Sequence, residues 1–214
     1  MPNATIEGFE CTLFYDYDCH RDHILNQLSD NGKIDWLEKR MRMIFLDPLK
    51  KIYDRTSVAH NELNVQASGA PMTPMLMTFS LLMNGIEALG SFLIIPSSSD
   101  RKKNYRRFND FMTRYLPDWT VQIAAPHHGN RKLSDVLWEK YRNGLAHSFA
   151  ILEAGIDDVP GNGKTMIKDN VLQVDGWKFF ADLVSAVDRM FEEVRNLPTA
   201  RATFLQRFED VYHC

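Results

Sequence analysis

An almost uncharged segment of 21 residues, Met75 to Ile95, constrains the fold of this chain more than any other feature. Its single charge, Glu87, falls near the middle. A carboxylate at the centre of a bilayer costs about 2.5 to 3.5 kcal/mol, which cancels roughly six or more apolar residues at about −0.3 to −0.6 kcal/mol each. We therefore expect a central core helix surrounded by other helices, and no membrane span.

Polar side chains form a stripe along this apolar helix. Ser80, Asn84, Glu87 and Ser91 recur at spacings of four, three and four residues, which places them on one face. Buried polar groups cost free energy unless they have partners. Two readings stay open: the stripe is a hydrogen-bonded seam or an exposed edge, or Glu87 or Asn84 lies opposite Arg142 and lines a cleft.

Apolar periodicity and breaker residues divide the rest of the chain mainly into helices. Pro48 lies inside the first of them and should kink or split it. A turn-rich stretch and an alternating pattern predict a small β-hairpin over 151–174, and 117–131 is expected to be a loop. Residues 1–32 mix aromatics, acids and turn formers, so we expect irregular structure there with a short strand near 11–14. The expected helices span 35–55, 74–95, 101–116, 133–148, 176–196 and 199–212.

The bulk composition limits the classes of protein to consider. A net charge of −3 argues against a protein that binds nucleic acid over its whole surface, but it allows a local basic site. Three cysteines without metal-finger spacing favour a reduced, cytoplasmic setting. The first ten residues lack the basic and apolar regions of a secretory signal.

The hexapeptide Arg142-Asn143-Gly144-Leu145-Ala146-His147 combines a guanidinium, an amide and an imidazole near the end of a helical pattern. Arginine presents a planar fork of donors that suits phosphate oxygens, and histidine titrates near neutral pH. On an ideal helix Arg142 and His147 lie about 140° apart, so they share a face only where the helix ends or loosens. Gly144, a poor helix former, predicts such a departure. In the alternative reading, Arg142 pairs with an acid such as Glu139 and His147 packs at the helix end.

This hexapeptide resembles the R-x4-6-H motif of the HEPN superfamily (higher eukaryotes and prokaryotes nucleotide-binding domains), with Asn143 as the polar residue usual after the arginine. The resemblance covers about residues 73–197. It implies an all-α fold, a HEPN-like antiparallel four-helix bundle with an inserted hairpin and extra N- and C-terminal helices. Residues 1–72 would be an N-terminal extension and 198–214 a C-terminal helix, all within one compact domain.

The resemblance also implies a metal-independent RNA endonuclease that acts as a homodimer, often as a toxin or defence protein. In cleavage of RNA by its own 2′-hydroxyl, His147 would act as general base or general acid. Arg142 would neutralise charge on the phosphorane, and Asn143 would orient the phosphate or the histidine. No cofactor or metal is implied. The alternative is a non-catalytic member of the fold that binds a nucleotide or RNA, or that partners an antitoxin or a nucleotidyltransferase.

A basic run, 101–107, precedes the second bundle helix, with five cations in seven residues. Cations at a helix N-terminus oppose the helix dipole, so their placement is unusual for stability alone. The run is either a solvated helix start or an RNA-binding strip with a stacking ring. The RNA-binding candidates are Lys102, Lys103, Tyr105, Arg106 and Arg107.

Three other patterns are interpreted without a function. The segment 160–165 resembles the tail of a phosphate-binding loop, but position 158 is aspartate and a strand pattern follows, so it predicts a turn. The cluster of Cys19, His20 and His23 lacks the spacing of a tetrahedral metal site. His127 and His128 are expected to be an exposed loop pair.

Overall fold

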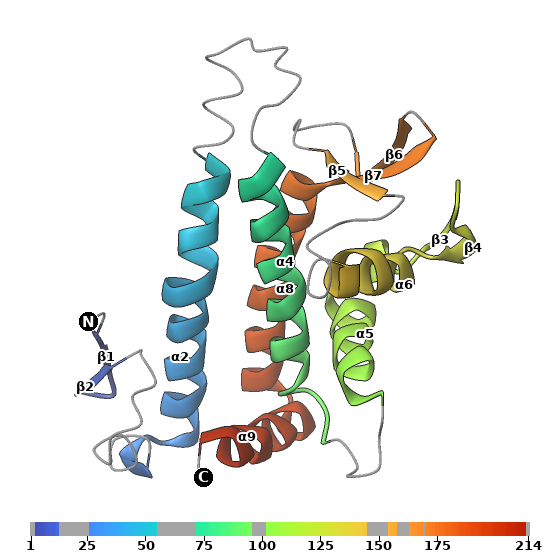
Figure 1. Ribbon diagram of the computed structural model, residues 1–214. Coiled ribbons are helices and arrows are strands. Elements are labelled where there is room, and N and C mark those ends of the chain that lie inside the picture. The colour runs from blue at the N-terminus through green and yellow to red at the C-terminus, as the bar shows by residue number, and fades with distance from the viewer. Residues whose placement is uncertain are drawn as a thin grey trace.

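The computed structural model describes residues 3–12, 26–54, 72–95, 102–144, 154–157, 163–168 and 170–212. Three long helices run side by side in Figure 1: α2 (Asp30–Arg40), α4 (Met72–Gly90) and α8 (Gly176–Asn196). The helix α9 (Pro198–Tyr212) lies across one end of this layer, and α5 (Lys103–Tyr115) packs against α4.

The helix α4 supplies the centre of the hydrophobic core, as its apolar sequence predicts. Its fully buried side chains are Phe79, Leu82, Met83, Ile86 and Leu89. The helix α8 starts at Asp175, whose carboxylate accepts a hydrogen bond from the Lys178 amide at 2.8 Å. Its apolar face then adds a second buried row of Phe179, Leu183, Val187, Met190, Phe191 and Val194. Within the described ranges, none of the helices is long and apolar enough to cross a bilayer.

Two glycines let neighbouring segments approach α4 closely. A methyl group at Gly85 would lie 2.1 Å from Cζ of Phe45, and one at Gly90 would lie 2.0 Å from the carbonyl oxygen of Arg107 in α5. Glycine inside a helix costs about 0.5 to 1 kcal/mol relative to alanine. At Gly85 and Gly90 this cost is offset by packing that any larger side chain would prevent.

The helix that begins at Asp30 is not interrupted at Pro48. A π-helical turn, η1 (Met41–Leu46), follows α2, and helical residues continue to Asp54. Proline lacks an N–H, and its ring collides with the carbonyl four residues earlier. The wider π turn just before the proline accommodates this defect, with the Asp47 amide bonding to the Arg42 carbonyl. The expected kink or split thus takes the form of a local change in helix type.

The predicted all-α class is wrong, because the described residues include three small sheets in addition to the helices. Strands β1 (Asn3–Ile6) and β2 (Phe9–Thr12) form a hairpin whose turn residues, Glu7 and Gly8, both have positive φ. A second hairpin, β3 (Gln122–Ala125) and β4 (Gly129–Lys132), replaces the expected loop. The two-residue turn between β1 and β2, with positive φ at both positions, matches the natural twist of paired strands.

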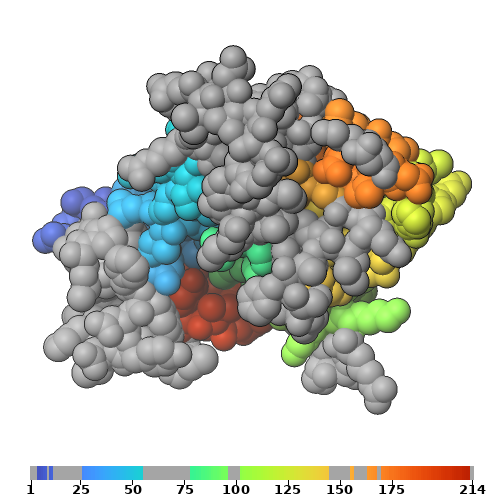
Figure 2. Space-filling model, turned by 45° about the horizontal axis from the view of Figure 1, so that its top comes forward, coloured from blue at the N-terminus to red at the C-terminus, as the bar shows by residue number. Residues whose placement is uncertain are grey.

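The hairpin predicted over 151–174 is only partly correct, because its alternating pattern divides into two strands that pair with each other, and the strand before them pairs in parallel. Strands β6 (Thr165–Lys168) and β7 (Val171–Asp175) pair antiparallel, and β5 (Ala154–Asp157) pairs with β7 in parallel. Figure 2 shows the orange residues of β6 and β7 beside the yellow-green ones of β3 and β4. Asn170 Nδ2 lies 3.2 Å from His127 Nε2 between these two sheets.

The predicted four-helix bundle is also wrong. In the described residues, the third of its expected helices consists of α6 (Leu133–Val136) and a π-helical turn η3 (Leu137–Asn143). In Figure 1 this segment lies across the direction of α4 and α8 instead of alongside them. Residues 145–150 fall outside the described part of the chain.

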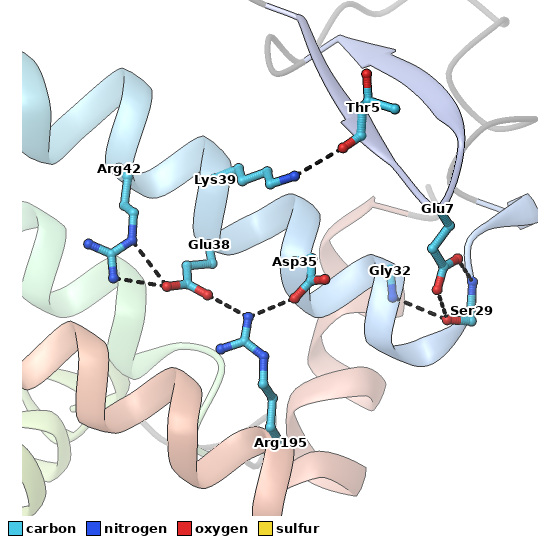
Figure 3. A network of polar contacts seen from close by, with 9 residues as sticks. All are labelled: Thr5, Glu7, Ser29, Gly32, Asp35, Glu38, Lys39, Arg42 and Arg195. Carbon is cyan, nitrogen blue, oxygen red and sulfur yellow. Dashed lines mark hydrogen bonds and ion pairs between the residues drawn. The ribbon is translucent and has the colours of Figure 1, made fainter.

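A network of ion pairs ties α2 to α8 and to the N-terminal hairpin (Figure 3). Arg195 of α8 donates to Asp35 at 2.7 Å and to Glu38 at 2.5 Å, and Arg42 donates to Glu38 at 2.9 Å. Lys39 reaches the carbonyl of Thr5 in β1 at 3.0 Å. The N-terminal residues 3–12 are therefore fastened to the helical layer through polar contacts of α2.

Candidate functional site

The helical segment that carries Arg142 is anchored by Tyr141. Its side chain is fully buried, its ring packs 5.3 Å from that of Phe79 in α4, and its hydroxyl donates to the Gly155 carbonyl of β5 at 2.6 Å. Burial keeps the pKa of Tyr141 well above its usual range, so this hydroxyl stays a donor. The next two residues, Arg142 and Asn143, are consequently presented at the half-buried surface beside α4.

Glu87 holds the Arg142 guanidinium in place, as the lone carboxylate in α4 predicted. One oxygen of Glu87, Oε2, accepts from Arg142 Nη2 at 2.7 Å and from Nε at 3.1 Å. On the other side, Arg142 Nη1 donates to Oδ1 of Asn143 at 3.1 Å. The guanidinium carbon also lies 4.8 Å from the ring centroid of Trp138, one helical turn earlier. The expected contact between Glu87 and Arg142 is therefore confirmed.

This arrangement orients the guanidinium without using all of its donors. Arginine has five N–H groups, and the contacts to Glu87 and Asn143 account for three of them. The pair is largely enclosed, since the Arg142 and Glu87 side chains keep 17% and 16% of their exposure. A phosphate that approaches the remaining N–H groups would meet a cation whose position is already fixed.

The position of Glu87 in α4 is costly without such a partner. It lies in the last turn of the helix, where the carbonyl ends make an anion unfavourable. Arg142 lies in the last turn of its own segment, where a cation is favourable. The positive charge of Arg142 therefore offsets the unfavourable position of the Glu87 carboxylate.

The helix changes type along the segment that includes Arg142, and not at Gly144. Residues Leu137–Asn143 are π-helical, whereas Gly144 keeps right-handed helical angles of φ −58° and ψ −51°. Single π-helical turns are uncommon and recur at functional sites. The prediction that Gly144 breaks the helix is therefore wrong, and His147 lies outside the described residues.

Among the described residues, the others considered as partners of Arg142, or as part of the polar stripe, form no hydrogen bond or ion pair with it. Glu139 pairs with Arg131 at 2.6 Å, so it is not the partner of Arg142. Asn84 is exposed on α4, and Glu87 makes the contact that either residue had been expected to make. Ser91, the last residue of the stripe, donates to the Ala88 carbonyl at 2.6 Å and so caps the end of α4.

The basic run begins α5 and lies close to Trp138. Lys102, Lys103 and Arg106 are exposed, whereas Arg107 is half-buried against α4. Tyr105 is no freely mobile ring: its hydroxyl donates to Asp135 at 2.6 Å. Burial, together with this hydrogen bond, raises the pKa of Tyr105 to about 12.

A cavity of about 510 Å³ joins this basic run to the Arg142 segment. Its described lining residues are Lys102, Lys103, Asn104, Tyr105 and Trp138. The rings of Tyr105 and Trp138 meet edge to face, with centroids 5.6 Å apart and planes inclined by 68°. Trp138 lines this cavity together with the basic run and also contacts Arg142. It therefore links the basic run and the Arg142 motif, which the sequence had suggested separately.

Trp138 was not selected from the sequence, where it belongs to the apolar side of the helical pattern. One signal was present: Trp138 and Arg142 are four residues apart, a spacing that brings helical side chains together. The proximity of Lys102 and Lys103 had no such local signal. It depends on how α5 packs beside the α6–η3 segment.

Two of the patterns interpreted without a function can be compared with the structure. Within 160–165 the structure describes only 163–165: Gly163 has φ +86°, and strand β6 begins at Thr165, as the strand pattern predicted. The Lys164 ammonium pairs with Asp118 at 2.9 Å. His127 is exposed in the β3–β4 turn, but His128 is buried, so the expected exposed pair is wrong for His128. Residues 19–23 lie outside the described part of the chain.

Comparison of the chain with models of protein families, with curated proteins and with solved structures gives no match. The resemblance to HEPN proteins therefore stays a prediction that rests on the hexapeptide.

Proposed function

We propose that this protein is a metal-independent RNA endonuclease whose active site contains Arg142, Asn143 and His147. The observation that best supports the proposal is the fixed Arg142 guanidinium, held by Glu87 and Asn143 with N–H groups to spare. A fixed cation stabilises charge that develops on a phosphate without any reorganisation during the reaction. A cavity with two exposed lysines next to this site favours a polyanionic substrate.

In the proposed reaction the 2′-hydroxyl of RNA attacks the adjacent phosphorus atom. A bond forms between the 2′-oxygen and phosphorus, and the bond from phosphorus to the 5′-oxygen of the next nucleotide breaks. His147 takes the proton of the 2′-hydroxyl or gives one to the leaving 5′-oxygen. Arg142 binds the phosphorane oxygens, and Glu87 acts as a positioning residue. The products are a 2′,3′-cyclic phosphate and a 5′-hydroxyl.

We further propose that two copies of the chain act together. One motif supplies one imidazole, whereas this cleavage benefits from a base and an acid on opposite sides of the phosphate. Two-fold pairing around Arg142, Asn143 and His147 would bring two imidazoles to one cleft. A protein that is monomeric by sedimentation at micromolar concentration and fully active would exclude this arrangement.

The test is incubation of the purified protein with defined RNAs in EDTA, alongside His147→Ala and Arg142→Gln. Both variants should lose cleavage by roughly 100-fold or more, the range of a general acid–base group or a charge-stabilising donor. Arg131→Gln is the matched control, because Arg131 is a nearby arginine that pairs with the exposed Glu139. Activity that EDTA abolishes and magnesium restores, or full activity in His147→Ala, would overturn the proposal.

A second candidate function is binding of RNA or a nucleotide without cleavage, and the cavity at Trp138 favours it because that cavity needs no catalytic group. In that case the protein binds RNA in EDTA, and neither wild type nor His147→Ala produces fragments. A dedicated partner, such as an antitoxin or a nucleotidyltransferase, fits either function.

A further inference from the structure

The cavity between α5 and the α6–η3 segment combines three properties that suit one class of ligand. It is large enough for a nucleoside-sized group, since small-molecule sites typically measure roughly 300 to 1,000 Å³. Two aromatic rings form one corner of it, and two exposed lysines stand at its edge. A planar group that also carries negative charge matches such a lining.

The aromatic corner is rigid. The Tyr105 hydroxyl is bonded to Asp135 at 2.6 Å, and the Trp138 ring packs at 5.2 Å from Phe108, which is fully buried. Because the two ring planes are inclined by 68°, a flat ligand on one ring meets the other at its edge. Aromatic side chains fixed in this way lose little entropy on binding.

Two exposed lysines at the start of α5, Lys102 and Lys103, give the cavity a positive edge. Lys102 occupies the N-cap position, and its side chain makes no capping hydrogen bond to the helix. The first amides of a helix point outward and favour an anion. Lys102 and Lys103 next to these amides disfavour the free state and favour a bound phosphate.

The cavity and the Arg142 site share one side chain, Trp138. The Arg142 guanidinium lies over the Trp138 ring at 4.8 Å, and the same indole lines the cavity. A base against Trp138 would therefore contact the same indole over which the Arg142 guanidinium lies.

We infer that this cavity is a subsite for one unpaired nucleotide of the substrate, with its base against Tyr105 and Trp138 and a flanking phosphate on Lys102 and Lys103. The inference rests on the proposed RNA-directed function and adds a selection rule to it. A base paired within a duplex cannot enter the corner, so the subsite selects single-stranded segments.

Binding is measured by fluorescence anisotropy in EDTA, on the His147→Ala background so that no cleavage interferes. The probe is a labelled single-stranded RNA of about twelve nucleotides, used alone, annealed to its complement, and with abasic sites that keep the phosphates. Trp138→Leu should weaken binding of the single strand roughly five- to 150-fold, the range of one base–aromatic stack. Trp138→Phe, which keeps a ring, should restore part of the loss.

A second variant tests the subsite without replacing Trp138, so it remains informative if Trp138→Leu does not fold. Lys102→Gln/Lys103→Gln changes two exposed side chains and should lower the slope of log K against log salt by about 1.4 for a single strand. Lys50→Gln/Lys51→Gln is the matched control, since these adjacent lysines are also exposed but lie on the helix that continues α2. It should leave both affinity and slope unchanged.

Equal affinity for the single strand, the duplex and the abasic strand would overturn the inference, and so would unchanged binding by a folded Trp138→Leu. Failure of the subsite can be told from failure of the proposed function. If only the subsite is wrong, wild type cleaves RNA in EDTA while abasic and intact strands bind alike. If only the cleavage is wrong, single-strand selectivity remains and no fragments form.

Discussion

Replacement of Glu87 by glutamine tests how strongly α4 holds Arg142. The substitution keeps the shape, the helix propensity and one carbonyl acceptor, and it removes the negative charge. Hydrogen bonds to charged groups contribute about 1.5 to 3 kcal/mol when enclosed, whereas exposed ion pairs contribute about 0 to 1. With 17% and 16% of the two side chains exposed, we expect an intermediate coupling of about 1 to 2 kcal/mol.

Charge-assisted hydrogen bonds are roughly twice as strong as neutral ones, so Glu87→Gln should cost about 1 kcal/mol of unfolding free energy. A chain of this length would then melt about 2 to 4 °C lower. A double-mutant cycle with Arg142→Gln, measured by urea denaturation, isolates the coupling of the pair. The control cycle uses Lys50 and Asp54, an exposed pair that should couple by less than about 0.5 kcal/mol. A Glu87–Arg142 coupling no larger than that control would refute the reasoning.

Two further predictions concern stability. Burial opposes ionisation of Glu38, but its hydrogen bonds to Arg195 and Arg42 outweigh this and lower its pKa below the ordinary 4.5; stability should therefore fall as the pH drops below about 4.5, and Glu38→Gln should flatten that acid limb in pH-dependent melting curves. Gly85→Ala should lower the unfolding free energy by about 1 to 3 kcal/mol, because the new methyl group overlaps the Phe45 ring; Phe45→Leu should recover part of this loss, and a stabilised Gly85→Ala protein would contradict the packing.

The helices were predictable because their apolar residues repeat along whole faces. In α4 and α8 burial follows the helical spacing closely, and breakers such as Pro198 stand where the sequence suggested. The sheets lacked comparable patterns. Strand β4 has the sequence Gly-Asn-Arg-Lys, without a β-branched or aromatic residue, so only pairing with β3 defines it. The parallel pairing of β5 with β7 is a non-local contact, which no short pattern encodes.

One hairpin did have a local signal. Glu7-Gly8 separates two four-residue strands, and a two-residue loop that ends in glycine favours the turn observed there. The acidic and aromatic residues that follow directed the interpretation toward irregular structure instead. The strand expected near Cys11 is present as β2, but its partner β1 was missed.

In the candidate site, the contact between Glu87 and Arg142 could be predicted from charge alone. A lone carboxylate in an apolar helix needs a cation, and Arg142 was the nearest motif residue on a neighbouring helix. The cavity at Trp138 could not be deduced in this way. Its lining depends on the start of α5 lying beside the indole, a contact between segments far apart in the sequence.

Analysis of the RNA ends formed in EDTA tests the central claim most directly. Single-stranded RNA is incubated with wild type and with His147→Ala, and the fragments are identified by mass spectrometry. The account predicts 2′,3′-cyclic phosphate and 5′-hydroxyl ends from wild type and no such fragments from His147→Ala. Fragments with 3′-hydroxyl ends, or cleavage that appears only after magnesium is added, would contradict it.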